Sequence, residues 1–122
     1  MQRRKGRKPE MIDTETTIVK QIDILGTEYL IHLIGQISKD ELVLGEIDYT
    51  NQIITLDSSM KTDVMSVTLL HEVIHGILFA NGLNNENANE NLIQCLASGL
   101  HQVLVANPEI KSLLCLRQST SG

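Results

Sequence analysis

Residues 71–75, with the sequence His-Glu-Val-Ile-His, have the residue types and the spacing of a metal-dependent hydrolase. Residues four positions apart lie on one face of an α-helix, so His71 and His75 can both direct an imidazole nitrogen at one ion. Glu72 lies beside that face, where its carboxylate can act as the general base that takes a proton from an attacking water molecule. The pattern therefore predicts two zinc ligands and one catalytic residue on a single helix.

The residues around this motif are apolar on nearly every side of the expected helix, which runs from about residue 62 to residue 81. A helix of this kind is usually buried. Two histidines and a glutamate inside it need partners, because burying a polar group without one costs several kcal/mol. A metal ion would supply that partner. In the alternative interpretation, the histidines bind backbone carbonyls and Glu72 points to water.

A catalytic zinc ion usually has three protein ligands, so the motif predicts one more donor further along the chain. Glu90 is the preferred candidate, because it shares a helical face with apolar residues that would pack on the first helix. Glu86, one turn earlier among polar neighbours, is the alternative ligand or a helix cap. Gln94 would be a poorer ligand. His101 lies about 16 Å further along the helix axis, so it could replace Glu90 only if the helices crossed elsewhere.

Peptide hydrolysis also needs a donor to the oxyanion that develops in the transition state. The chain has two phenols, Tyr29 and Tyr49. Tyr49 follows an expected strand at the Thr50-Asn51 turn, and it is the candidate stabiliser of the transition state. The strand at residues 52–57 could pair with an extended peptide through a free edge of the sheet. We therefore expect a protein or peptide substrate.

The fold is indicated by a change in the period of the apolar residues. Before residue 57 they alternate with a period of two, which predicts strands, and after it the period is about 3.6, which predicts helices. The strands are expected at residues 18–25, 28–34, 43–49 and 52–57. A second helix is expected from the Asn-rich stretch at residues 84–91 to about residue 106. The prediction is an α+β fold in which a small, mostly antiparallel sheet of about four strands packs on two helices.

The length of 122 residues suits a single domain, which we expect at residues 11–115, with a flexible tail at residues 116–122. Five of the ten basic residues lie within the first eight positions, so residues 9–122 have 5 basic against 15 acidic residues, a formal charge of −10. An acidic body argues against an electropositive nucleic-acid groove. Weak nucleic-acid contact is expected only from residues 1–10, a basic arm that we expect to be disordered.

The chain contains no uninterrupted apolar run of 18 residues, which predicts that it does not span a membrane, and its basic start is not followed by an apolar signal segment. The two cysteines, Cys95 and Cys115, are too few for a disulfide framework and lack a metal-binding spacing. We therefore expect an intracellular protein without a membrane partner.

Three segments together resemble the ImmA/IrrE group of zinc metallopeptidases, especially its small phage- and prophage-encoded members: residues 53–59, residues 69–75 and residues 90–97. The resemblance covers roughly residues 43 to 107. In that group the third ligand is a glutamate followed by an apolar residue at +3, an amide at +4 and Ala at +7, a pattern that Glu90 matches. Ile93-Gln94 stand here where the group has Ala-Asn.

The resemblance implies a minimal zincin fold, a Zn²⁺ cofactor and an enzyme that acts in the cytoplasm of a bacterial host. It also implies a gene-regulatory substrate, such as a phage or mobile-element regulator. The alternative is a non-catalytic protein of phage origin that keeps the zincin fold to bind a protein partner.

Overall fold

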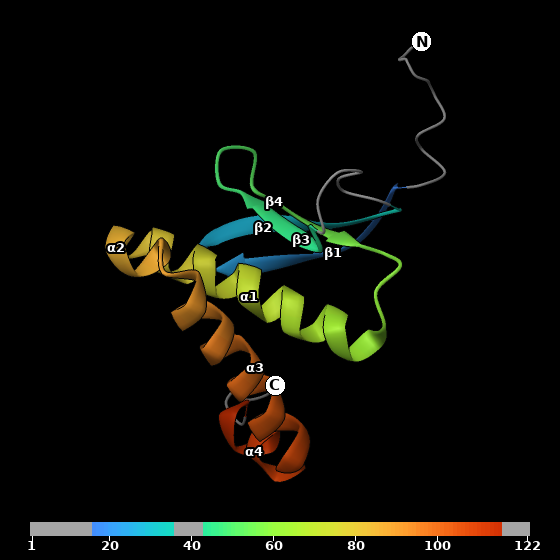
Figure 1. The fold of residues 1–122 in the computed structure, drawn as a ribbon, viewed down its shortest axis with the longest axis vertical. Helices are drawn as coiled ribbons and strands as arrows, with labels where there is room; N and C mark the ends of the chain where they lie inside the picture. Colours follow the sequence, from blue (N-terminus) through green and yellow to red (C-terminus); the bar gives the residue numbers. More distant parts are fainter. Residues whose placement is uncertain (1–15, 36–42, 116–122) are drawn as a thin grey trace, which may run out of the picture.

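The computed structural model describes residues 16–35 and 43–115. In chain order, the elements of these residues are β1 (Thr16–Ile24), β2 (Thr27–Ile34), β3 (Gly45–Asp48), β4 (Ile53–Asp57), α1 (Thr62–Ala80), α2 (Asn84–Asn87), α3 (Glu90–Ala106) and α4 (Pro108–Leu114). The sheet covers one side of α1 and α3 packs on another, while α4 follows at the far end of α3 (Figure 1). The expected α+β fold is confirmed. The predicted arm at residues 1–10 and tail at residues 116–122 lie outside the described residues.

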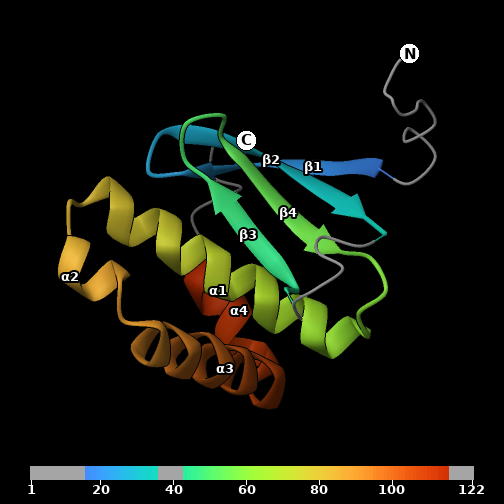
Figure 2. The ribbon, with the colours of Figure 1, turned by 45° about the horizontal axis from the view of Figure 1, so that its top comes forward.

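The sheet has the strand order β1-β2-β4-β3. The pairs β1-β2 and β3-β4 are antiparallel, and β2-β4 is parallel. The sheet is therefore mostly antiparallel, as predicted. However, the order puts β4 between two neighbours, which use the hydrogen-bonding groups on both of its sides. The prediction that residues 52–57 present a free edge is consequently wrong, and the edge strand on that side is β3 (Figure 2).

The turn that joins β3 to β4 is fixed by Asp48. Its carboxylate accepts hydrogen bonds from the backbone N–H of Asn51 at 3.0 Å and from the side-chain amide of Asn51 at 2.9 Å. These bonds lower the pKa of the Asp48 carboxyl below its ordinary value, because they stabilise the charged form. The turn holds Tyr49 directly after the edge strand.

Helix α1 lies between two apolar clusters. On its sheet side, the buried residues are Ile24, Tyr29, Ile31, Ile54 and Leu56. On its other side, Ile74 packs with Ile93 and Ala97 of α3. The prediction that α1 is buried all round is wrong at its margins, where Val64 and Phe79 are 43% and 48% exposed. Among the described helices, only α1 is long and apolar enough to cross a membrane by length and composition, a test that the central helix of a layered fold also passes.

Helix α1 ends where the sequence predicts, in a Schellman motif. Gly82 has φ +70°, a conformation that few residues other than glycine adopt readily. Its N–H donates to the carbonyl of Phe79 at 3.1 Å, and the N–H of Leu83 donates to the carbonyl of Leu78 at 3.0 Å. The chain then turns directly into α2.

The Asn-rich stretch forms two separate helices: the short α2, which was not predicted, and α3, whose asparagine cap and end at Ala106 agree with the prediction. Asn89 is the reason for the break, because its side chain accepts a hydrogen bond from the N–H of Leu92 at 3.0 Å and so caps α3. This cap makes Glu90 the first residue of α3. A carboxylate in that place is favoured by the positive end of the helix dipole.

Candidate metal centre

The structure brings the three predicted ligands together. One nitrogen of His71, one nitrogen of His75 and one oxygen of Glu90 lie within 4.8 Å of one another. The Nε2 atom of His71 is 2.9 Å from Oε1 of Glu90, and the Nε2 atom of His75 is 3.3 Å from both Glu90 oxygens. Two ligands come from consecutive turns of α1, and the third comes from the first residue of α3.

The Nδ1 atoms of the two histidines contact amide side chains. His71 Nδ1 is 2.8 Å from Oε1 of Gln94, and His75 Nδ1 is 2.6 Å from Oδ1 of Asn87. When Nδ1 of a neutral imidazole donates to an amide oxygen, the lone pair of the ring is on Nε2. In this neutral form, both Nε2 atoms direct lone pairs toward the Glu90 carboxylate.

This arrangement fits a divalent cation. Lone pairs of neutral rings repel the carboxylate unless a cation lies between them, and that cation can be a proton on Nε2 or a metal ion bound by all three groups. A tetrahedral site with bonds of about 2.0–2.2 Å separates its ligand atoms by about 3.3–3.5 Å. The 3.3 Å contact between His75 and Glu90 matches that spacing, whereas the 2.9 Å contact between His71 and Glu90 is shorter and has the length of a hydrogen bond. Glu90 is 65% exposed, so the site is open to solvent on one side.

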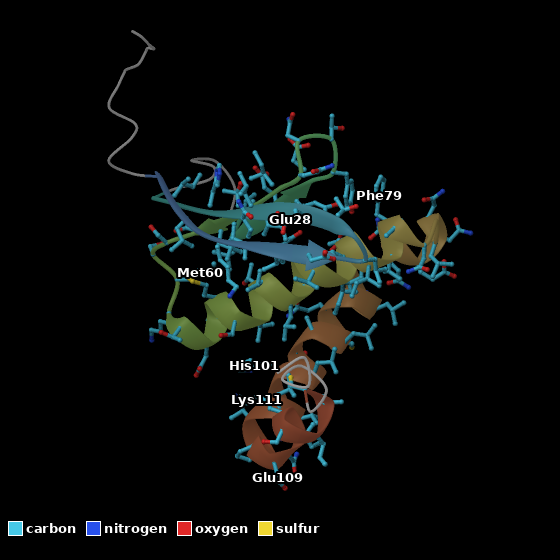
Figure 3. All side chains as sticks on the ribbon, turned by 180° about the vertical axis from the view of Figure 1, so that it is seen from behind. Glu28, Met60, Phe79, His101, Glu109 and Lys111 are labelled. Atoms are coloured by element: carbon cyan, nitrogen blue, oxygen red, sulfur yellow. The ribbon has the colours of Figure 1, made fainter. Side chains whose placement is uncertain are left out.

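The alternative third ligands are not part of this group. Glu86 is exposed on α2 and does not belong to the converging donors of the described residues. His101 lies far along α3 toward α4 (Figure 3), where it lines a separate pocket. Gln94 contacts the ring of His71 instead of sharing the ligand position. Among the candidates that the sequence left open, the geometry selects Glu90.

Glu72 is only 6% exposed, and the part that remains accessible lines the pockets beside the ligands. Burial raises the pKa of its carboxyl above the ordinary value, because the charged form loses solvation. Positive charge on His71 and His75 acts in the opposite direction and is the weaker influence. The predicted general base is therefore next to the ligands with an increased affinity for a proton.

Gly45 allows the edge strand to pass close to this carboxylate. A Cβ atom at this position would be 2.6 Å from Cγ2 of Thr68 and 3.4 Å from Oε2 of Glu72. A larger residue would require the Thr68 side chain to shift or β3 to move away from α1. Sequence analysis did not select Gly45, although a glycine inside a strand indicates a close approach of another group.

Two pockets meet at the site. One, of about 260 Å³, is lined by Leu44, Thr68 and Gln94 among others, and the other, of about 290 Å³, is lined by Glu46, Ile47, Tyr49, His75 and Glu90 among others. Both pockets reach Gly45, His71 and Glu72. They form one groove that follows β3 across the candidate metal ligands.

Tyr49 lies in this groove, whereas Tyr29 does not. The hydroxyl oxygen of Tyr49 accepts a hydrogen bond from Nδ2 of Asn87 at 3.0 Å. Its ring stacks on Phe79, with centroids 4.0 Å apart and planes inclined by 6°. Tyr29 is 3% exposed in the core beside the sheet, where burial raises the pKa of its hydroxyl.

Asn87 and Gln94 are functional candidates that sequence analysis missed in these roles. The available signal was their spacing, because they stand three residues before and four residues after Glu90. Amide side chains one helical turn from a metal ligand can reach the atoms that surround it. Metal-binding histidines generally donate their second N–H to such a partner.

No known family model matches this chain, and neither the curated proteins nor the solved structures contain a significant match. The resemblance to the ImmA/IrrE group thus stays a prediction based on the three sequence segments.

Proposed function

We propose that this chain is a zinc-dependent metallopeptidase that hydrolyses peptide bonds of an intracellular protein. The observation that carries the proposal is the convergence of His71, His75 and Glu90 beside the buried carboxylate of Glu72 in an open groove. Structural zinc sites are usually closed by four protein ligands, whereas catalytic sites keep one position open. A site with three donor residues and one solvent-exposed side corresponds to the catalytic arrangement.

Zinc is the metal that this donor set suits best. Two imidazole nitrogens with one carboxylate are a known ligand set of catalytic zinc, whereas magnesium and calcium prefer sites built from oxygen atoms. When bound, a zinc ion lowers the pKa of a water molecule and polarises the carbonyl of a substrate. The amide contacts of Gln94 and Asn87 orient the two rings toward the ligand position.

Glu72 is the proposed general base. Its raised pKa suits this role, because a base is most effective when its pKa lies near the working pH. The carboxylate takes a proton from the attacking water and later gives a proton to the leaving amine. Its place on the wall shared by both pockets lets it reach a peptide in the groove.

The outer edge of β3, which pairs with no other strand of the described residues, is the proposed binding surface for the peptide backbone. The carbonyl of Leu44 accepts a hydrogen bond from the N–H of Asp57 at 2.9 Å, so Leu44 directs its backbone toward β4. In an antiparallel pair this direction alternates, and the backbone groups of Gly45 and Ile47 therefore face outward. An extended peptide can add to such an edge as a further strand.

Tyr49 is the proposed donor to the oxyanion. Its oxygen already accepts a hydrogen bond from Asn87, which leaves its own O–H free to donate. Tyr49 lines the same pocket as Glu72 and Glu90. For the natural substrate, the resemblance to the ImmA/IrrE group supports a phage or mobile-element regulator in the bacterial cytoplasm.

The proposal is tested by incubating the purified chain with a bacterial lysate and identifying new protein N-termini by mass spectrometry. We expect zinc in about one equivalent and cleavage that a chelator abolishes. Glu72→Gln should reduce cleavage by about 10²- to 10⁴-fold while zinc stays bound, because a general base is removed. The matched control is Glu109→Gln, an exposed glutamate of α4 that does not line the groove. Equal cleavage by wild type and Glu72→Gln would contradict the proposal.

A non-catalytic binding protein is the second candidate. The observation that favours it is a row of exposed apolar side chains on one face of α3: Leu92, Leu96, Leu100 and Val103 are 39–47% exposed. Contiguous apolar surface of this kind often marks a site for a partner. A function that survives Glu72→Gln and is lost when Leu96 is changed to Glu would favour this candidate.

A further inference from the structure

The side chain of Asn87 joins a candidate metal ligand, His75, to a second residue of the groove, Tyr49. Its oxygen contacts Nδ1 of His75 at 2.6 Å, and its nitrogen donates to the Tyr49 hydroxyl at 3.0 Å. We propose that Asn87 positions both His75 and Tyr49. The proposal rests on the metal site of the proposed function, but it does not require peptidase activity.

The backbone of Asn87 is well fixed for this role. Its N–H donates to the carbonyl of Leu83 at 2.9 Å, at the point where the end of α1 turns into α2. Asn87 is the last residue of α2 and is half-buried, whereas the other three residues of that helix are exposed. The short helix thus delivers one side chain into the space between α1 and the turn after β3.

The oxygen of Asn87 selects the tautomer of His75. An amide oxygen can only accept a hydrogen bond, so the proton of the neutral ring is held on Nδ1 and the lone pair is on Nε2. Nε2 is the atom that faces Glu90. Without this acceptor, the ring would be free to rotate and to carry its proton on the nitrogen that must bind the metal.

The nitrogen of Asn87 holds Tyr49 over the groove. Donation from the amide occupies the Tyr49 oxygen as an acceptor and leaves the phenolic proton for a ligand. The stacking of Tyr49 on Phe79 fixes the ring plane, and the amide fixes the position of the hydroxyl within that plane. Only a group with an acceptor and a donor can perform both tasks, which is why a carboxamide is needed.

Gln94 provides a comparison within the same site. Its oxygen contacts Nδ1 of His71 at 2.8 Å, in the same way that Asn87 contacts His75. Gln94 is exposed, and among the described residues its side chain has no second hydrogen-bonded partner. Asn87 should therefore have the larger effect, because it is less accessible to water and links two groups.

The experiment compares Asn87→Ala, Asn87→Asp and the control Asn85→Ala, an exposed amide on the same helix. Zinc affinity is measured by competition with a chelating dye. The tautomer of His75 is read in the metal-free chain from the nitrogen chemical shifts of its ring. Loss of a residue that orients a ligand typically weakens metal binding about 10- to 100-fold, and we expect this for Asn87→Ala.

Asn87→Asp distinguishes the contact with His75 from the contact with Tyr49. It also provides a second variant if Asn87→Ala does not fold. It keeps the acceptor for His75, so zinc affinity should remain within about threefold of wild type, while the Tyr49 ring signals should shift because the donor is lost. The proposal would be overturned by a His75 ring that carries no proton on Nδ1 in the metal-free wild type. It would also be overturned if Asn87→Ala and Asn85→Ala gave the same zinc affinity. A chain that binds zinc and shows these effects without cleaving any protein would count against the proposed function alone.

Discussion

The two sides of α1 are built differently. On the sheet side, five large side chains from three strands are 0–4% exposed and form a closed apolar cluster: Ile24, Tyr29, Ile31, Ile54 and Leu56. On the α3 side, the buried cluster consists of Ile74, Ile93 and Ala97. Next to it lie His71, His75 and Glu90, which are polar groups that a metal ion would join. The stability of the fold is thus concentrated on one side of the helix and the chemistry on the other.

The difference indicates how α3 is held in place. The apolar cluster that joins it to α1 has three buried residues, with Val67, Leu70 and Leu78 partly buried around them. The other face of α3, with Leu96 and Leu100, is open to solvent. Metal binding contributes to folding when the ligands come from separate elements, because the site exists only in the folded state. We infer that a bound ion would stabilise the docking of α3 far more than it would stabilise the sheet.

The largest expected loss of stability comes from a substitution in the apolar cluster on the sheet side of α1. Ile54 is 0% exposed, and Ile54→Ala should lower the free energy of unfolding by about 2–5 kcal/mol, since it leaves a cavity in the apolar cluster. The measurement is urea denaturation followed by circular dichroism, without metal. The neighbouring Ile53→Ala, on the opposite face and only half-buried, should cost less. Equal losses for the two variants would contradict the one-sided core.

A smaller loss of stability is expected when a chelator removes the metal ion that would join α1 to α3. At a free zinc concentration 100 times the dissociation constant, binding should add about 2.7 kcal/mol to the stability. Hydrogen exchange should locate this gain, with amides of α3 exchanging faster after chelation and amides of β2 and β4 unchanged. His101→Ala is the control, because this histidine lies outside the ligand group. If chelation accelerated amide exchange equally in the sheet and in α3, the proposed difference between the two sides of α1 would be contradicted.

The features that the sequence could predict are those that depend on interactions between residues close together in the chain. The positions of His71, Glu72 and His75 on one helix depend only on helix geometry, which acts over four residues. The choice of Glu90 could also be predicted, because its helical stripe was expected to pack on α1 through Ile93, Ala97, Leu100 and Leu104. Ile93 and Ala97 are buried there, whereas Leu100 is 47% exposed. The strands followed from alternation of apolar residues, with differences of at most about two residues at their ends for β3 and β4.

The remaining features depend on interactions between segments far apart in the sequence. Alternation shows that β4 is a strand but not that it pairs with β2 on one side and β3 on the other, so the free edge was assigned incorrectly. The contacts of Asn87 with His75 and Tyr49 depend on how a short helix meets the turn after β3. The period of the apolar residues contains no information about where these two elements contact each other. Gly45 is similar, because its role depends on the distance from β3 to Thr68.

The smallest expected effect concerns the free-energy cost of burying the charged carboxylate of Glu72 between the two sides of α1. Its folded pKa is raised, so below the pKa of the unfolded chain the carboxyl is protonated in both states and costs nothing. As the pH rises through the folded pKa, the charged form must be buried and stability falls. Glu72→Gln avoids this loss, and in the metal-free chain it should gain about 1 kcal/mol near neutral pH and almost nothing at acidic pH. Thermal unfolding at several pH values measures the difference, with Glu109→Gln, an exposed glutamate of α4, as a control that should show none. A gain that is the same at every pH would mean that the variant improves packing, and that the carboxylate is not a destabilised group held for catalysis.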